Sequence, residues 1–380
     1  MSIVDDIYCY CKNSFVLIQY KVLIFFLKSK KSNEKKSILF INTGQIGDLM
    51  VSSLILDNDE VFGDVNVYLI IKQKYLDLFQ DYKGKVKIIV YNYKKYKWSF
   101  FYKIKFLNYL QSLNSEKCFN VTSARGMLND EMSLLSGASE VYCLNSNWRY
   151  LKKAFRKRMD SEYTGVLYKD KNNEYAKHSE MLNHFKKKEV ISVKNKKVFN
   201  VFRTPKLFGN EILNEDDYIT VAPLPSDVKR GWGIKNFREL CKELSINSKV
   251  VLLGSNNDRK ILDSISESNR KIINTAGLLK IYEVPSVISK SKLFIGNDSG
   301  LTHIALKLNI PMIAIIGGGN YGKFFPFVEK NSEVVYLFDK MDCFGCEWDC
   351  IYRERYCITN VSLTDILNSM RKLLKAETKL

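Results

Sequence analysis

The sequence predicts an α/β protein built from two successive domains. Short apolar runs of strand type alternate with segments that have the 3.6-residue periodicity of helices, as in parallel sheets covered by helices. This alternation begins at Ser37, is interrupted by a polar stretch and begins again at Tyr218. The chain has 380 residues, which is more than one hydrophobic core usually serves. We therefore expect two domains with a cleft between them, the usual place for a ligand.

Residues 1–36 form an extension ahead of the first domain. Its apolar segment, Phe15 to Leu27, is followed at once by the lysine-rich run Lys28–Lys36. The segment is shorter than the ~20 residues that cross a bilayer. Asp5 and Asp6 precede it and no small-residue cleavage site is evident, so a signal peptide is not expected. Two interpretations stay open: an amphipathic helix with a basic flank at a membrane surface, or an extra helix packed on the first domain.

Residues 37–205 are predicted to form the first domain. It opens with a strand at Ile38–Ile41, a glycine-containing turn and a helix at Asp48–Leu56. The turn has neither the GxGxxG spacing of a dinucleotide site nor the Gly-Lys-Ser/Thr of a P-loop. Asp48 is expected either to cap its helix or, facing the cleft, to act as a general base. Further strands are expected at 65–71, 86–91 and 118–122, and a helix at 174–188.

Residues 206–217 are the expected linker, because the stretch from Thr204 to Asp217 combines Pro205, Gly209 and a polar cluster. The second domain, residues 218–360, repeats the earlier alternation, and residues 361–380 add a C-terminal helix. The expected elements of the second domain are a strand at 218–222, a helix at 236–244, a strand at 249–253 and a helix at 258–266. The loop after its first strand carries Lys229 and Arg230, either of which can neutralise a diphosphate.

The segment Lys292–Gly319 is the most informative part of the chain. A strand at Leu293–Gly296 runs into three good N-cap residues, so a helix is expected to begin near Ser299 or Gly300. The first N–H groups of a helix lack intrahelical partners and attract anions, which makes this turn a candidate phosphate site. His303, in the first turn, is either structural or a ligand contact. A second strand at 312–316 completes a βαβ crossover.

Four of the nine cysteines are clustered near the C-terminus. They are Cys343, Cys346, Cys350 and Cys357. Four thiols are enough for a tetrahedral structural zinc site, although the spacing is shorter than in most familiar zinc modules. Without a signal peptide, thiols or a metal are expected rather than disulfides.

The formal net charge is +18, from 59 Lys and Arg against 41 Asp and Glu. Such a surface attracts polyanions, which include nucleic acid, anionic lipid and phosphorylated sugars. No helix-turn-helix, finger or RNP-like signature occurs, so nucleic acid is not expected as a partner. The simpler alternative is a solvated basic face in a lysine-rich composition.

Several motifs, taken in order, resemble glycosyltransferase family 9, the heptosyltransferase-like enzymes of bacterial lipopolysaccharide assembly. The resemblance runs from about Ser37 to about Lys375. Its pieces are ILFINTGQIGDLMVSSLIL from Ile38, LLSGA at 134–138, the Lys229–Trp232 segment, LLGSNNDR from Leu252, the run AGLLKIYEVPSVISKSKLFIGNDSGLTHIA and the cysteine cluster. The chain departs from the family pattern at Asn120, where an aspartate is common, and the sequence Lys-Arg-Gly-Trp leaves open which cation contacts phosphate.

The resemblance implies a GT-B architecture of two Rossmann-like domains with an interdomain cleft. It also implies an inverting transfer without a catalytic metal, from a nucleotide-sugar donor held mainly by the second domain. Asp48 would be the base, and Asp258 would meet the donor ribose. The acceptor side would be held by Gly44, Gln45 and Gly47. The diphosphate would be cradled by Asp298, Ser299, Gly300, Leu301 and His303, with Lys229 or Arg230.

The expected function is transfer of a heptose or related sugar from a nucleoside-diphosphate donor to lipopolysaccharide or another cell-surface glycan. No cofactor is expected for catalysis, and zinc would be structural. A lipid-linked acceptor implies a cytoplasmic protein, or one peripheral on the inner membrane. Two alternatives stay open: an inactive protein of the same fold that binds sugar nucleotides or polyanions, and a GT-B-fold epimerase, for which no acid/base pair is evident.

Overall fold

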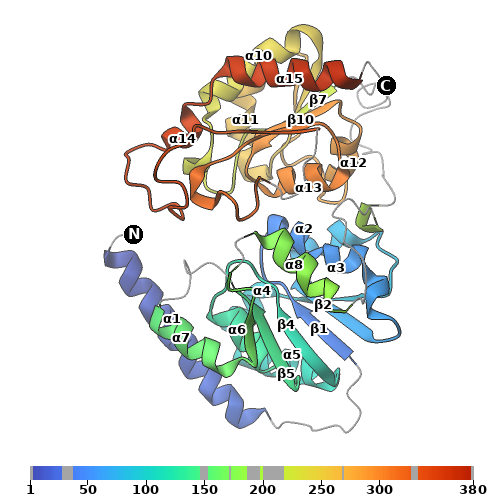
Figure 1. Ribbon diagram of the computed structural model, residues 1–380, viewed down its shortest axis with the longest axis vertical. Coiled ribbons are helices and arrows are strands. Elements are labelled where there is room, and N and C mark those ends of the chain that lie inside the picture. The colour runs from blue at the N-terminus through green and yellow to red at the C-terminus, as the bar shows by residue number, and fades with distance from the viewer. Residues whose placement is uncertain are drawn as a thin grey trace. The chain divides into compact units, whose positions relative to one another are not determined.

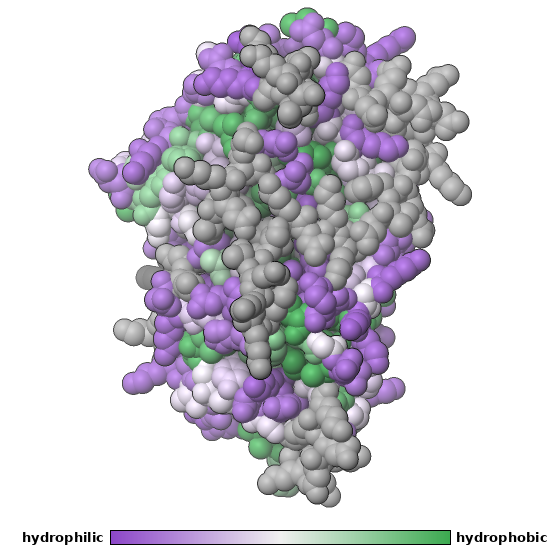
Figure 2. Space-filling view, turned by 45° about the vertical axis from the view of Figure 1, so that its right-hand side comes forward, coloured by the Kyte–Doolittle hydropathy of each residue, from purple (hydrophilic) through white to green (hydrophobic). Residues whose placement is uncertain are grey.

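The chain forms two compact units, Met1–Ser192 and Val193–Leu380. The computed structural model describes residues 3–27, 37–145, 153–170, 173–185, 197–199, 218–267, 269–326 and 333–377. Each unit is a six-stranded parallel sheet with helices (Figure 1). The prediction of two α/β domains is confirmed, while the predicted linker 206–217 lies outside the described residues. Figure 2 shows hydrophilic residues over much of one face, with smaller hydrophobic areas between them.

The first sheet has the order β3-β2-β1-β4-β5-β6, with parallel pairing throughout. Its strands are β1 (Ser37–Ile41), β2 (Asn66–Lys72), β3 (Lys87–Tyr91), β4 (Ser115–Asn120), β5 (Glu140–Leu144) and β6 (Gly165–Leu167). All five residues of β1 are buried, as expected for a central parallel strand. The strand order reverses between β1 and β4. In open α/β sheets, ligands bind beyond the carboxyl ends of the strands at such a switch point.

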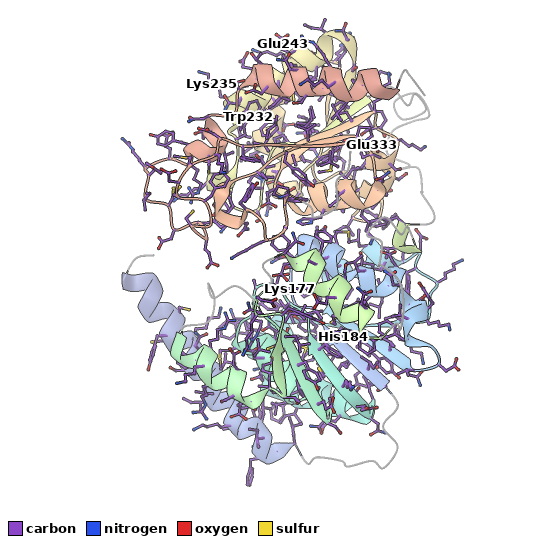
Figure 3. The ribbon with its side chains drawn as sticks, viewed as in Figure 1. Lys177, His184, Trp232, Lys235, Glu243 and Glu333 are labelled. Atoms are coloured by element: carbon purple, nitrogen blue, oxygen red, sulfur yellow. The ribbon has the colours of Figure 1, made fainter. Side chains whose placement is uncertain are left out.

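Eight α-helices are described in this unit. They are α1 (Ile3–Phe26), α2 (Ile46–Ser52), α3 (Leu54–Asp57), α4 (Tyr93–Trp98), α5 (Phe100–Ser112), α6 (Met127–Leu134), α7 (Lys153–Glu162) and α8 (Glu174–Asn183). Two short helices, α2 and α3, stand where one helix was predicted at 48–56. Between them, Ser53 donates its hydroxyl to the carbonyl of Met50 at 2.7 Å. Lys177 of α8, labelled in Figure 3, pairs with Glu174 at 2.7 Å on the same helix.

The N-terminal segment is a helix packed on the first unit, as one of the two interpretations expected. Tyr20 and Leu23 of α1, and Leu27 directly after it, join the core formed with residues of β1, α5 and α6. Gln19 accepts a hydrogen bond at 2.8 Å from Lys103, whose buried ammonium also pairs with Glu131 at 2.7 Å. In the described part of the chain, no helix is long and apolar enough to cross a membrane.

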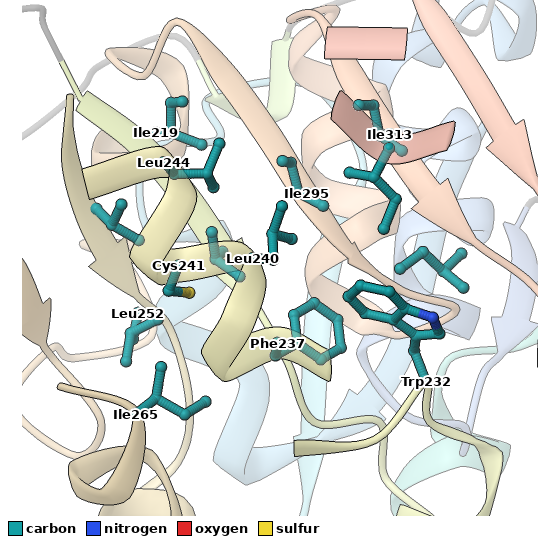
Figure 4. Close-up of a cluster of buried hydrophobic side chains, with 14 of the residues drawn as sticks. Ile219, Trp232, Phe237, Leu240, Cys241, Leu244, Leu252, Ile265, Ile295 and Ile313 are labelled. Atoms are coloured by element: carbon teal, nitrogen blue, oxygen red, sulfur yellow. The ribbon is translucent and has the colours of Figure 1, made fainter. Parts of the chain in front are cut away.

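The second sheet has the order β12-β11-β10-β7-β8-β9. Read from the β9 edge, this is the same strand order as in the first sheet. Its strands are β7 (Tyr218–Ala222), β8 (Lys249–Leu252), β9 (Ile272–Asn274), β10 (Leu293–Asn297), β11 (Met312–Ile315) and β12 (Val334–Leu337). Its α-helices are α10 (Ile234–Asn247), α11 (Arg259–Ser266), α12 (Val284–Ser289), α13 (Gly300–Leu308), α14 (Tyr356–Thr359) and α15 (Leu363–Glu377). The switch point lies between β7 and β10. The core beside it includes Trp232, Phe237 and Leu240 (Figure 4).

Candidate functional site

The turn after β1 holds Asp48 in the first turn of α2. Its Oδ2 accepts a hydrogen bond from the backbone N–H of Gln45 at 2.8 Å, so Asp48 caps the helix that carries it. Asn42 holds the turn through two hydrogen bonds. Its amide donates to the carbonyl of Asp48 at 3.0 Å, and its Oδ1 accepts from the N–H of Gly44 at 2.7 Å. Asp48 remains only half-buried. The capping interpretation is thereby confirmed, and the capped carboxylate keeps some exposed surface.

Gly44 is required by close packing rather than by an unusual backbone angle. A Cβ built at this position would overlap the side chain of Asp48. Gly47 lies within α2, and Gln45, at the N-cap, accepts a hydrogen bond from the hydroxyl of Tyr75. The three predicted acceptor-side residues therefore share one short turn with Asp48.

Lys72, at the end of β2, is a functional candidate that the sequence analysis missed. Its side chain is 8% exposed, and its ammonium donates to the carbonyl of Gly44 at 3.1 Å. Burial, reinforced by Lys74, lowers the pKa of Lys72 to about 8, while the charge of Asp48 opposes this shift. The available signal was a charged residue ending a buried strand that pairs with β1 at the switch point.

A buried polar network supports the same edge of the sheet on the β4 side. The N–H of Thr43 donates to the hydroxyl of Thr122 at 3.0 Å, and the amide of Asn129 donates to the hydroxyl of Thr43 at 3.0 Å. Asn120, at the position where the family commonly has aspartate, is fully buried and donates to Asp130 at 3.1 Å. Asn120 is therefore part of the buried network that supports the turn after β1, rather than a residue exposed to a ligand.

Arg125 is the cation of this network. It is 1% exposed and binds the fully buried carboxylate of Asp130 through two nitrogens, at 2.9 and 3.0 Å. A third nitrogen-oxygen contact, at 2.8 Å, joins it to Asp160. Burial alone would lower the pKa of Arg125, but Asp130 raises it above its ordinary value, so the guanidinium stays protonated.

In the second unit, α13 begins at the carboxyl end of β10, as predicted. Ser299 is the N-cap residue, and the first backbone bond of the helix runs from the N–H of His303 to the carbonyl of Ser299 at 3.3 Å. The N–H groups of Gly300 and Leu301 therefore precede the first bond of the helix. These groups, with the helix dipole behind them, suit an anion such as phosphate.

Two other predicted residues of this turn have different surroundings. Asp298 retains some exposed surface, yet burial raises the pKa of its carboxyl group to about 6. His303 is 3% exposed, and its ring lies 4.5 Å from that of Phe325, so burial lowers its pKa to about 3. A neutral imidazole packed on aromatic rings favours the structural role that the sequence left open for His303.

The loop that carries the candidate cations lies next to the α13 turn. The N–H of Trp232, labelled in Figures 3 and 4, donates to Asn297 Oδ1 at 3.0 Å, and the amide of Asn297 donates to the carbonyl of Pro223. Since Asn297 is the last residue of β10, it joins the β7 loop to the candidate phosphate turn. The parallel pairing of β7 with β10 places both turns at one edge of the sheet.

The two cations of this loop differ in their contacts with other side chains and in their exposure. Arg230 pairs with Asp227 at 3.1 Å, and its guanidinium lies 4.7 Å from the centre of the Trp348 ring. Lys229 is exposed and lines a cavity of about 550 Å³ together with Trp348 and Arg355. Lys229 is therefore the cation better placed to meet an incoming anion.

Asp258 follows β8 in the same way that Asp48 follows β1. Its Oδ2 accepts from the N–H and the hydroxyl of Ser255 at 2.7 and 2.6 Å. The glycine four residues earlier, Gly254, leaves little room for a Cβ beside Asp258. Each aspartate accepts the backbone N–H three residues earlier, Asp48 at the start of α2 and Asp258 in the turn before α11, so this geometry alone does not separate their predicted roles.

The clustered cysteines are all free thiols. Burial, and after it the charges of neighbouring thiols, raises the pKa of Cys343 and of Cys357. Cys357 also accepts a hydrogen bond from the N–H of Gly318 at 3.5 Å. Among the described residues, no group of three or more His, Cys, Asp or Glu side chains is placed to hold a metal ion. The predicted zinc site therefore stays a prediction.

If that prediction is right, protein purified without oxygen is expected to contain about one zinc per chain, because four thiolates complete a tetrahedral site. Elemental analysis of the wild type and of a variant with all four cysteines changed to serine measures this. A wild type that contains no zinc would contradict the prediction.

Two parallel sheets of the same Rossmann-like order, each with a polar turn at its switch point, place the chain in the GT-B class of folds. The chain belongs to glycosyltransferase family 9 (heptosyltransferase), whose model matches residues 109–350. The predicted family and fold class are thereby confirmed.

Individual relatives are distant. The chain is 23% identical over 148 residues to lipooligosaccharide heptosyltransferase 2 of Campylobacter jejuni, an alignment that covers 37% of this chain and 46% of that protein. The chain thus spans about half the length of this curated relative. Two solved structures share the fold. A family 9 glycosyl transferase from Veillonella parvula is 13% identical, with a TM-score of 0.67 over 91% of this chain and 100% of the other. The ADP-heptose heptosyltransferase II of E. coli is 16% identical, with a TM-score of 0.64 over 90% and 99%.

Proposed function

We propose that the protein is a glycosyltransferase that moves a heptose or related sugar from a nucleoside-diphosphate donor to lipopolysaccharide or another cell-surface glycan. The observation that carries this proposal is the start of α13, which Asn297 joins to the Lys229–Trp232 loop. This arrangement provides backbone N–H groups and a cation at one switch point, which is what a departing diphosphate requires. Membership of family 9 supplies the reaction class.

The proposed reaction is a single inverting displacement without a catalytic metal. Asp48 removes the proton from an acceptor hydroxyl, and the oxygen attacks the anomeric carbon of the donor. The bond from that carbon to the diphosphate oxygen breaks, and the electron pair leaves with the diphosphate. The α13 N-terminus and Lys229 stabilise the negative charge that develops there.

Lys72 is proposed to position the turn that carries the base. Its ammonium holds the carbonyl of Gly44, and its charge lies near enough to Asp48 to interact with the carboxylate. Lys72 thus supports the base without itself taking part in the displacement.

The donor is proposed to be an ADP-heptose or a close relative, since the E. coli neighbour is described as an ADP-heptose enzyme. Asp258 would meet the ribose, and Ser299, Gly300 and Leu301 the diphosphate. A carboxylate accepts hydrogen bonds and repels phosphate, so Asp298 suits a sugar hydroxyl better than the diphosphate. His303 would contribute by packing the helix start.

Lys229→Met is expected to raise the KM for the donor about tenfold or more, because one charge-assisted contact to phosphate contributes roughly 1.5–3 kcal/mol. Arg230→Met is expected to have a smaller effect, since Arg230 already pairs with Asp227. Initial rates at varied donor concentration measure both. A larger rise in KM for Arg230→Met would reverse the assignment.

The proposal is tested by thermal shift with a panel of nucleotide sugars, followed by transfer assays with the donor that binds. Binding to the native state raises the melting temperature. Formation of the glycosylated acceptor with release of nucleoside diphosphate supports a transferase. Donor binding without transfer or hydrolysis would instead indicate the inactive binding protein, and conversion of the bound sugar to an epimer would indicate the epimerase.

The acceptor is proposed to be a lipid-linked glycan. The protein would then work in the cytoplasm, at least part of the time at the inner face of the membrane. Its net charge of +18 supports attraction to anionic glycolipid and phospholipid headgroups. Fractionation of the cell of origin tests this placement.

A further inference from the structure

Helix α1 has a second apolar face in addition to the one that packs on the first unit. The packed side chains Val16, Tyr20, Leu23 and Leu27 recur at helical spacing, and all are 8% exposed or less. A separate set also recurs at helical spacing but is exposed. Its members are Phe15 (51%), Ile18 (62%), Val22 (41%), Phe25 (84%) and Phe26 (55%). Since residues three, four and seven apart share one side of a helix, this set forms a stripe turned away from the core.

Aromatic side chains of α4 and α5 extend this stripe at both of its ends. Trp98, which is 71% exposed, lines a shallow pocket together with Phe15. At the other end, the rings of Phe26 and Phe100 are 5.9 Å apart, and Phe101 beside them is 84% exposed. We call the docking face the set formed by Phe15, Ile18, Val22, Phe25, Phe26, Trp98 and Phe101. Contiguous exposed apolar side chains of this extent mark interaction sites.

The two segments that supply the docking face carry charges of one sign. The sequence contains no Asp or Glu from residue 7 to 33 or from residue 82 to 115, the segments that supply the face. Exposed cations stand in both segments. They are Lys12, Lys21, Lys94, Lys95 and Lys105. An apolar stripe bordered by lysines complements a surface with an apolar interior and anionic groups at its edge.

We propose that the docking face lies flat on a lipid bilayer that carries anionic headgroups, with α1 parallel to the membrane surface. The phenylalanines, Ile18 and Val22 enter the boundary between headgroups and acyl chains. Trp98 occupies the interfacial level that tryptophan prefers. The lysines contact lipid phosphates. Lipid binding of this kind does not depend on sugar transfer, although it would bring the proposed transferase to a lipid-linked acceptor.

A second copy of the chain is a poorer occupant. In a twofold-symmetric pair, each docking face would meet an identical face. The bordering lysines of the two copies would then lie close to one another with no carboxylate from either segment between them, and like charges repel. A lipid surface avoids this repulsion and neutralises the lysines.

The test is sedimentation of the full-length chain with phosphatidylcholine vesicles, with and without phosphatidylglycerol. The wild type is expected to pellet with the anionic vesicles and to be released by salt, because its lysines are screened. The triple variant Phe15→Ser, Ile18→Ser, Phe25→Ser is expected to bind the anionic vesicles at least about tenfold more weakly than the wild type, since apolar burial drives insertion. Ile246→Ser on α10 is the matched control, because Ile246 is 64% exposed on the other unit. It is expected to bind like the wild type.

A second readout does not depend on the triple variant. Brominated lipids in the vesicles are expected to quench the fluorescence of Trp98, and Trp98→Phe is expected to remove that quenching. A wild type that stays in the supernatant, or a triple variant that pellets as well as Ile246→Ser, would overturn the proposal. So would a wild-type dimer that the triple variant converts to a monomer without any vesicle binding.

Failure of the docking face and failure of the proposed transfer are separable. With a soluble acceptor fragment, the triple variant is expected to retain wild-type turnover, because none of its residues belongs to the candidate site. Loss of vesicle binding together with normal transfer, or the reverse, identifies which of the two functions is absent.

Discussion

Asp48→Asn is expected to leave the first unit folded and to lower sugar transfer by about two orders of magnitude or more, the scale usual for a general base. The asparagine side chain keeps an oxygen that accepts the N–H of Gln45, so the cap of α2 is retained. Its neutral amide has no capacity to take a proton from the acceptor hydroxyl. Initial rates with donor and acceptor, together with thermal melting, separate these two effects.

The chain offers a matched control for this variant. Asp258→Asn changes an aspartate whose carboxylate likewise accepts the backbone N–H three residues earlier, but in the turn between β8 and α11 and away from the switch point. It is expected to change the KM for the donor and to leave turnover near the wild-type value. If Asp48→Asn also retains near wild-type turnover, Asp48 has only its structural role and the mechanism lacks its base.

Arg125→Met is expected to lower the free energy of unfolding of the first unit by about 3–5 kcal/mol, because it leaves the carboxylate of Asp130 buried without its cation. The methionine fills part of the space but neutralises nothing. Amide hydrogen exchange in β4 and α6 measures the stability of this unit separately, which matters because two units need not unfold together.

Lys117→Met is the control for Arg125→Met. Lys117 pairs with Glu140 at 3.7 Å, and both side chains are more than one third exposed, so the pair contributes about 1 kcal/mol or less. The double variant Arg125→Met, Asp130→Asn is expected to recover part of the loss, since no buried charge is then left alone. An Arg125 variant no less stable than Lys117→Met would show that the network is not a source of stability.

Local signals in the sequence were enough to predict the start of α13. Cap residues stand directly before a periodic apolar segment, and both strand β10 and helix α13 begin within a residue or two of the expected positions. The strand predicted at 218–222 is found with those bounds. These elements were predictable because their ends are determined by neighbours in the chain.

Contacts between distant segments were not predictable in the same way. Lys72 reaches Gly44 only because β2 pairs with β1, and Asn297 meets Trp232 only because β7 and β10 are adjacent. Helix α1 begins well before the apolar run that indicated it, and Tyr10 in this earlier part packs against Phe155 at 5.2 Å. Tertiary contacts of this kind stabilise helical residues that lie outside the apolar run seen in the sequence.

The repeated strand order has a consequence for how such a protein changes over generations. In each sheet the turn after the first strand, which carries Asp48 in one unit and Lys229 in the other, is braced from within its own unit. Under the proposed function, substitutions around β7 and β10 would alter which nucleotide sugar is preferred without changing the turn that carries Asp48. Substitutions beyond β1 and β4 would alter the acceptor, so the two preferences could be inherited, and exchanged between lineages, separately.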